Sequence, residues 1–181
     1  NYGASGTFSN NTYSSANKYI EAQYKTAITM AVSPTNPNKV YVALSPFSQR
    51  VDNKLNVTGV PTLRKTTNAD AATPSWTTVS TGLPNQFIMD IAIKQSSDDS
   101  IMVALGGYGS SHIWLSPDGG ATWIDRGAGL PDVPFNAIVF DPENPKVVYA
   151  GSDLGVYVSP DLGQTWFDFN DGFTDATMVF D

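Results

Sequence analysis

The sequence contains no cysteine and a single histidine, His112. The lack of cysteine excludes disulfides, thiolate metal sites and cysteine nucleophiles, and one histidine cannot form a three-histidine zinc site. Basic residues are also few: 10 Lys and Arg stand against 17 Asp and Glu, which gives a net charge of −7 at pH 7. This is the wrong sign for a phosphate-binding surface, so nucleic acid is not an expected partner.

The sequence also lacks any long apolar run. No stretch approaches the roughly 18 consecutive apolar residues that a membrane-spanning helix requires, and Asn1 to Ser5 show no signal core, so we expect no membrane insertion. With 181 residues, of which 41% are hydrophobic, the chain is large and apolar enough to form a folded domain. Few lysines and many Ser, Thr, Asn and Gly favour an exported protein, secreted or at the cell surface, in an extracellular or periplasmic compartment.

An internal repeat is the clearest feature that is present. Residues 116–123, Ser-Pro-Asp-Gly-Gly-Ala-Thr-Trp, recur as residues 159–166, Ser-Pro-Asp-Leu-Gly-Gln-Thr-Trp, at a spacing of 43 residues. A degraded third copy ends at Trp76, where the Asp-x-Gly turn is missing. Gly-Leu-Pro or its remnant follows each copy. A period of this length is typical of β-propellers and other repeat architectures.

Two short β-rich runs precede each copy of the motif, with turn formers such as Pro and Asn between them. In the last repeat these runs are Ala137 to Phe140 and Val147 to Ala150, and a third run, Val156 to Val158, leads into the motif. A fourth strand begins at the tryptophan. Four short strands in roughly 45 residues predict an all-β fold of β-propeller blades, each made of four antiparallel strands. We expect about three to four blades here, as part of a larger propeller, because an open arc exposes sheet edges.

The repeated motif resembles the Asp-box, Ser-x-Asp-x-Gly-x-Thr-Trp, also called the BNR repeat. This repeat occurs in sialidases, xyloglucanase-type glycoside hydrolases, sortilin-type receptors and photosystem assembly factors. The resemblance covers nearly the whole chain and implies propeller blades whose boxes lie on the periphery, away from the catalytic face. It implies much less about activity, because the same fold carries unrelated functions.

The repeats divide the chain into five expected segments. The remaining blades of the propeller would come from the same chain or from another one. The segments are 1–26, the end of a preceding blade or an N-terminal extension; 27–86, a blade with an insertion at 45–62 and the degraded box; 87–134, a blade with the box 116–123; 135–175, a blade with the box 159–166; and 176–181, the first strand of a following blade.

The box residues have a structural role in this interpretation. The aspartate accepts hydrogen bonds from backbone N–H groups of its own turn, the glycine supplies a positive φ, and the tryptophan packs a large apolar area between sheets. The residues concerned are Ser116, Asp118, Gly120, Thr122 and Trp123 in one box, and Ser159, Asp161, Gly163, Thr165 and Trp166 in the other.

Asp153 is the candidate catalytic carboxylate. Xyloglucanase-type hydrolases use two carboxylates, one as acid and one as base. Similar enzymes place one of them in a strand-end motif like Tyr-Ala-x-Thr-Asp-x-Gly-Gly, and Tyr149 to Val156 is similar, with Asp153 at the matching position. Val156 departs from the second glycine, and the corresponding turn of the preceding repeat, residues 106–109, offers no carboxylate. The alternative is an aspartate that only caps its loop.

The insertion at 45–62 is the best candidate for a binding loop, because long loops on a rigid scaffold often carry recognition. Its candidate contact residues are Phe47, Arg50 and Lys54. Tyr108 and Trp114 offer aromatic surface for a sugar or a peptide, and ordinary packing within the blade is the alternative for both.

Other chemistry has less support. His112 follows two serines, but adjacent strand residues point to opposite faces, and the Gly-x-Ser-x-Gly elbow of serine hydrolases is missing. The acidic segment 168–175 offers oxygen ligands for calcium, but Phe173 stands where an EF-hand loop needs glycine. No cofactor is therefore expected, with calcium as the alternative.

Together these features predict an exported propeller segment that serves as a protein- or glycan-binding interaction module or scaffold. The alternative is a fragment of a polysaccharide-degrading glycoside hydrolase that uses Asp153. The two differ in one observation, because a hydrolase releases sugar whereas a binding module binds without turnover.

Overall fold

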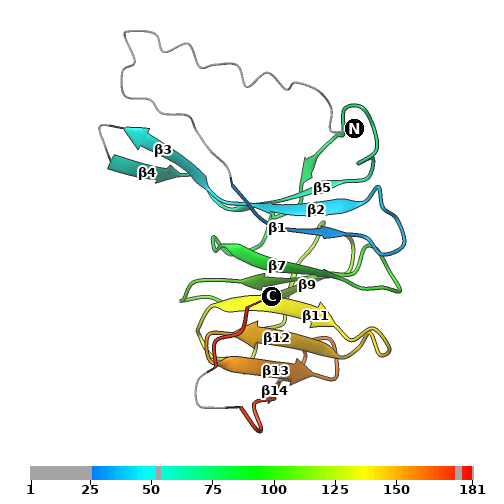
Figure 1. Ribbon diagram of the computed structural model, residues 1–181, viewed down its shortest axis with the longest axis vertical. Coiled ribbons are helices and arrows are strands. Elements are labelled where there is room, and N and C mark those ends of the chain that lie inside the picture. Colours follow the sequence, from blue (N-terminus) through cyan, green and yellow to red (C-terminus); the bar gives the residue numbers. More distant parts are fainter. Residues whose placement is uncertain (1–25, 52–53, 174–176, 181) are drawn as a thin grey trace.

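The computed structural model describes residues 26–51, 54–173 and 177–180, and of residues 47–58 it describes the backbone alone. The described residues form strands and turns, without helices. Three antiparallel sheets of four strands follow one another along the chain (Figure 1). Blade 1 contains β1 (Ala27–Val32), β2 (Val40–Leu44), β5 (Thr62–Thr66) and β6 (Thr77–Thr78); blade 2 contains β7 (Ile88–Ile93), β8 (Ile101–Leu105), β9 (Ile113–Ser116) and β10 (Ile124–Asp125); blade 3 contains β11 (Phe135–Phe140), β12 (Val148–Ser152), β13 (Gly155–Ser159) and β14 (Phe167–Asp168).

The three blades repeat one another in register. The first residue of the first strand pairs with the last residue of the second strand in each blade: Ala27 with Leu44, Ile88 with Leu105, and Phe135 with Ser152. A shift in register follows immediately in all three. A β-bulge of this kind bends the strand and increases its twist. The same deformation in each blade gives positions that can be compared directly.

The cores lie between blades rather than within one sheet. Strand β8 is buried along its whole length because it is covered on both faces. Its residues Val103 and Leu105 belong to the apolar cluster shared with blade 1, whereas Met102 and Ala104 belong to the cluster shared with blade 3. This alternation follows from the period of two in a β-strand. First strands β1, β7 and β11 are neighbours in the centre of the arc.

The antiparallel order divides the connections between two ends of the arc. At one end, here called the turn end, lie the tight turns between first and second strands and the two box turns. At the other, the loop end, lie the connections between second and third strands and those between blades. A hairpin of β3 (Phe47–Val51) and β4 (Lys54–Thr58) extends from blade 1 at the loop end, toward the left of Figure 1.

Both repeated motifs form the same hydrogen-bonded turn. In blade 2 the Ser116 hydroxyl accepts from the Gly120 N–H (2.7 Å) and donates to Asp118 Oδ1 (2.8 Å). Asp118 in turn accepts from the Thr122 N–H (2.8 Å) and the Thr122 hydroxyl (2.7 Å). Blade 3 repeats every one of these bonds with the equivalent residues, at distances of 2.7, 2.9, 2.8 and 2.7 Å. The turn therefore holds the following tryptophan in a fixed position.

Each of these tryptophans bonds to the preceding blade. The indole N–H of Trp123 donates to the carbonyl of Val79 in blade 1 (2.9 Å), and that of Trp166 donates to the carbonyl of Arg126 in blade 2 (2.6 Å). Gly120 lies against the same Val79 so closely that an added Cβ would stand 2.6 Å from its Cβ. The motif thus joins neighbouring blades as well as closing its own hairpin.

The degraded copy in blade 1 keeps the same arrangement without a charge. Thr66 and Asn68 take the places of the serine and the aspartate, and their side chains are joined by a 2.8 Å hydrogen bond. The Asn68 amide oxygen accepts from the Ser75 N–H (3.0 Å) and hydroxyl (3.1 Å), immediately before Trp76. The alignment of the repeats within the sequence missed this turn, because its loop is longer than those of the two intact boxes and asparagine replaces aspartate.

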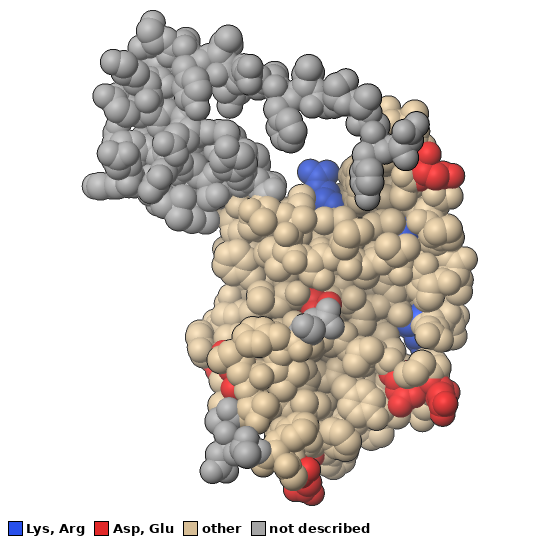
Figure 2. Space-filling view, viewed as in Figure 1, with Lys and Arg blue, Asp and Glu red and all other residues tan. Residues whose placement is uncertain are grey.

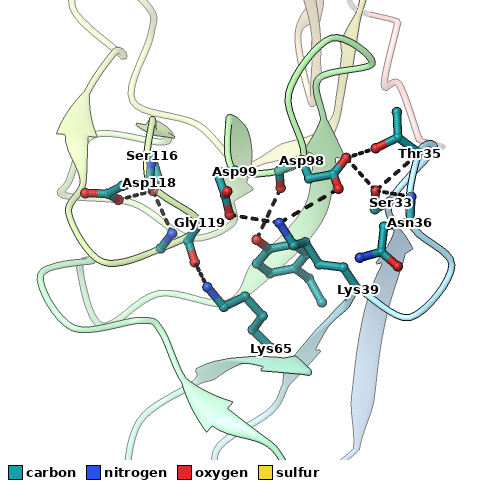
Figure 3. A network of polar contacts seen from close by, with 12 residues as sticks. Ser33, Thr35, Asn36, Lys39, Lys65, Asp98, Asp99, Ser116, Asp118 and Gly119 are labelled. Carbon is teal, nitrogen blue, oxygen red and sulfur yellow. Dashed lines mark hydrogen bonds and ion pairs between the residues drawn. The ribbon is translucent and has the colours of Figure 1, made fainter. Parts of the chain in front are cut away.

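Polar contacts join blades 1 and 2 at the turn end (Figure 3). The Ser33 hydroxyl donates to Asp98 (2.7 Å), and Lys39 pairs with Asp99 at 3.0 Å. The carbonyl of Asp99 accepts from the N–H of Gly119 in the box turn (2.7 Å). The turns of the two blades therefore hold each other at the end opposite the long connections.

The box carboxylates make stability depend on acidity. Hydrogen bonds from the Thr122 hydroxyl and N–H lower the pKa of Asp118 to about 2, below the ordinary value of about 3.9. A carboxylate whose pKa is lowered by folding stabilises the fold at pH values above its ordinary pKa. This contribution is lost as the pH falls from about 4 toward 2. We expect Asp118→Asn to lower the free energy of unfolding at neutral pH and to flatten its decline between those pH values, measured by urea denaturation. Glu143→Gln, at an exposed turn carboxylate, should leave the pH profile unchanged, and equal profiles for both variants would contradict this account.

Candidate functional site

The loop end brings together candidate residues from all three blades. The hairpin β3–β4, the loop of residues 106–112 and the turn of residues 153–154 each connect the second and third strands of their own blade. The three blades have the same strand order, so their equivalent connections lie at the same end of the arc. Tyr108 and Asp153 therefore share this end with the hairpin. Phe47, Arg50 and Lys54 lie on the hairpin, and their side chains are outside the described part of the chain.

Tyr108 stands exposed on a loop that is held from both sides. Its side chain is 64% exposed. Gln86, from the connection between blades 1 and 2, donates to the Tyr108 carbonyl (2.8 Å). Asp132, from the connection between blades 2 and 3, accepts from the Gly109 N–H at 2.7 Å. Gly107 has φ +86° and lies so close to Gln86 that a side chain there would collide with it. The loop thus presents an aromatic ring from a fixed backbone.

A buried histidine supports this loop from below. His112 is 3% exposed and its ring stacks on Phe135 at a centroid distance of 5.8 Å. Its Nε2 lies 3.0 Å from Asp132 Oδ1 and its Nδ1 lies 3.1 Å from the Leu105 carbonyl. The hydrogen bond with His112, followed by that from the Gly109 N–H, lowers the pKa of Asp132. Both ring nitrogens are engaged, and the hydroxyl of the neighbouring Ser111 donates instead to Asp125.

Asp153 is fixed in its turn by residues of blade 3. Its Oδ1 accepts from the Asn136 side-chain amide (2.9 Å), and its N–H donates to the Pro134 carbonyl (3.1 Å). Asn136 is 7% exposed and also donates to the Val179 carbonyl (3.2 Å). Asp153 as a whole residue is partly buried. It therefore holds its turn against β11, while remaining accessible at the loop end.

Trp114 lies differently from Tyr108. It is partly buried and packs against the apolar cluster between blades 1 and 2. Its indole N–H donates to the Ser111 carbonyl within its own blade (3.0 Å). The exposed aromatic surface of this loop is therefore supplied by Tyr108.

The acidic segment after β14 uses its polar groups in turns. Asp168 accepts from the Asn170 N–H (2.9 Å), and the Asn170 side chain accepts from the Val156 N–H (2.8 Å). Residues 174–176 of this segment lie outside the described residues. Over residues 26–51, 54–173 and 177–180, no group of three or more His, Asp or Glu side chains is placed to hold a metal ion.

Charged side chains are scattered over the face shown in Figure 2, with acidic groups at its lower right and bottom. The part of the chain that the structure describes contains no helix with the length and apolarity needed to cross a membrane.

Comparison with known proteins defines the fold. No protein-family model and no curated protein sequence matches the chain. Among solved structures, a GH74 enzyme from Niastella koreensis is similar, with a TM-score of 0.59 and 21% identity over 78% of this chain and 22% of that one. A GH74 xyloglucanase from Xanthomonas campestris has a TM-score of 0.60 and 18% identity over 82% of this chain and 24% of its own. YCF48 bound to a D1 peptide has a TM-score of 0.51 and 14% identity over 81% of this chain and 42% of its own.

These similar structures are β-propellers. The expected all-β blades of four antiparallel strands are therefore confirmed. At these identities the likeness concerns the fold alone. The chain spans less than a quarter of the length of the two GH74 enzymes and 42% of the YCF48 chain.

The repeats within the sequence did not indicate two residues that contact the Tyr108 loop, Gln86 and Asp132. Each reaches the Tyr108 loop from a connection more than 20 positions away, at separations of 22 and 23 residues. Both residues come shortly after the repeated Gly-Leu-Pro, which marks the connections between blades, but the residue types differ between the two copies and give no signal for these contacts.

Proposed function

We propose that this chain is a segment of an exported Asp-box β-propeller that acts as an interaction module, binding protein or glycan at its loop end. The observation that carries the proposal is the exposed Tyr108 ring on a loop fixed by Gln86 and Asp132. A rigid aromatic residue offers a large contact area at a small entropic cost, which suits both sugar stacking and peptide recognition.

The distribution of structural contacts supports this assignment. The two boxes use their serine, aspartate and threonine side chains inside their own turns, and their tryptophans bond to a neighbouring blade. The hydrogen-bonded turn that both boxes share supports the Asp-box assignment. The turn end is thus devoted to holding blades together, which leaves the loop end available for a ligand.

The similar structures suggest two classes of ligand. One of them is a propeller bound to a peptide, and another is a xyloglucanase. The hairpin β3–β4 adds a second element at the same end of the arc, and Phe47, Arg50 and Lys54 are proposed to contribute to binding there. The Ser-, Thr-, Asn- and Gly-rich composition supports export.

The alternative function is glycoside hydrolysis, with Asp153 as one of two carboxylates. The fold similarity to GH74 enzymes and the accessible position of Asp153 at the loop end favour keeping it as a second candidate. Its hydrogen bond from Asn136 favours a role in fixing the turn. Hydrolysis also requires a second carboxylate, which this proposal would assign to another part of the propeller.

Substitution of Tyr108 tests the binding proposal. A glycan array and a displayed peptide library, both screened with the whole chain, would provide the probe with the highest affinity. We expect Tyr108→Ala to weaken binding of that probe at least about tenfold, because an exposed rigid aromatic anchor contributes most of the affinity of such a site. Phe167→Ala is the matched control, since Phe167 is 57% exposed but lies on the outer strand β14. Equal effects of the two substitutions would contradict the proposed surface.

Substitution of Asp153 separates binding from catalysis. The binding module should release no reducing sugar from xyloglucan or another β-glucan, and Asp153→Asn should retain affinity for the selected probe. Reducing-sugar release by the parent chain that Asp153→Asn abolishes, with the same thermal unfolding temperature, would instead establish the hydrolase alternative.

A further inference from the structure

His112 has a hydrogen-bond acceptor at each of its two ring nitrogens. Nδ1 lies 3.1 Å from the backbone carbonyl of Leu105, and Nε2 lies 3.0 Å from Asp132 Oδ1. A neutral imidazole carries a proton on only one nitrogen, whereas the protonated ring donates from both. Both hydrogen bonds can therefore form only when His112 carries two ring protons, and the ring is then paired with the Asp132 carboxylate.

The groups that face this ring come from several elements. β8 supplies the Leu105 carbonyl, β11 supplies the stacked ring of Phe135, and the connection between blades 2 and 3 supplies the Asp132 carboxylate. A second carboxylate, Asp125 of β10, accepts from the hydroxyl of the residue that precedes the histidine. The charge that contacts the imidazole is thus that of Asp132, and protonation of the ring converts this contact into an ion pair.

Loss of one ring proton affects the two acceptors unequally. Leu105 is 0% exposed, so its carbonyl has no access to water, whereas the Asp132 side chain is 59% exposed. Leaving a buried acceptor without its donor costs more free energy than leaving one that water can solvate. The remaining proton therefore stays on Nδ1. Nε2 then presents a lone pair to a negatively charged carboxylate, and this repulsion favours movement of Asp132 toward solvent.

Asp132 also holds the loop that carries Tyr108. Its two carboxylate oxygens accept from the N–H of Gly109, at 2.7 and 3.0 Å. Gly109 follows Tyr108 directly and has φ +81°. A movement of the carboxylate away from His112 therefore removes one of the contacts that fix the backbone beside Tyr108.

We propose that His112 and Asp132 form a pH-sensitive switch for the Tyr108 loop. Imidazole is the side chain whose charge changes within the physiological pH range. With two protons on His112, Asp132 stays between the ring and Gly109 and the loop is held. When Nε2 loses its proton, Asp132 moves away and the loop loosens. Because ordering a loop on binding costs affinity, the Tyr108 surface binds more strongly at lower pH. Only this last consequence rests on the proposed function.

NMR of the whole chain without any ligand tests the switch. His112 is the only histidine in the sequence, so its two ring nitrogens can be assigned without ambiguity. As the pH is raised, we expect Nε2 to lose its proton while Nδ1 keeps its own. The protection factor of the Gly109 amide should fall at least about tenfold with the same midpoint. Loss of the Nδ1 proton first, or a Gly109 amide whose protection does not follow the ring, would overturn the switch.

Asp132→Asn provides a variant in which the switch should be absent. A side-chain amide can accept from the Gly109 N–H and at the same time donate to an unprotonated Nε2, so the neutral ring no longer repels it. We expect the protection of Gly109 to stay constant while His112 titrates in this variant. Asp171→Asn, the same change at an exposed carboxylate in the connection after β14, should retain the fall. A fall of equal size in Asp132→Asn and the parent chain would contradict the role of Asp132.

Affinity measurements separate the switch from the proposed function. For the probe selected on the glycan array or the peptide library, the affinity of the parent chain should fall at least about threefold as His112 loses its proton. The affinity of Asp132→Asn should stay constant over the same pH range. A constant parent affinity while Gly109 loosens would overturn the regulatory role. If Tyr108→Ala leaves binding of the probe unchanged, the proposed function fails, and the coupling of His112 to Gly109 is decided by the NMR titration alone.

Discussion

The arrangement of the arc depends on one hydrogen bond that crosses from blade to blade, from a tryptophan indole to a backbone carbonyl. Trp123 and Trp166 make it with Val79 and Arg126. The box turn positions this indole donor. Its serine and aspartate take part in four hydrogen bonds within the turn, and its glycine allows the preceding blade to approach closely. Since neighbouring sheets share their apolar cores, fixing their relative position also fixes which side chains are buried.

The contacts that join the blades also explain why the two ends of the arc differ. The turn end is occupied by box turns and by contacts such as Ser33 with Asp98, which hold the blades in register (Figure 3). The connections at the loop end are under fewer geometric constraints, so they vary in length from the two-residue turn at Asp153 to the β3–β4 hairpin. Tyr108 belongs to this variable end, and His112 and Asp132 hold its loop without using its side chain.

The fold was largely predictable because its determinants are local and repeated. The alternating apolar runs, the Pro and Asn turns and the two boxes all recur at similar spacing, so the strands of each blade follow from short segments. The turn formed by Thr66, Asn68 and Ser75 was not predictable in the same way, since hydrogen-bonding groups are retained while the residue types and loop length change. The candidate site was less predictable still. Gln86 and Asp132 contact the Tyr108 loop because folding brings three connections together. The Gly-Leu-Pro repeat marks two of these connections in the sequence but does not indicate which residues of them contact the loop.

The most direct test of the blade-to-blade bond is the free energy of unfolding of the Trp123→Phe variant, from urea denaturation at neutral pH. Phenylalanine retains an aromatic ring but leaves the Val79 carbonyl without its donor, so we expect a loss of about 1–3 kcal/mol. Trp114→Phe gives a comparison on the same face of the blade, because the Trp114 indole bonds within blade 2. A Trp123→Phe variant as stable as the parent chain would contradict the central role assigned to this bond.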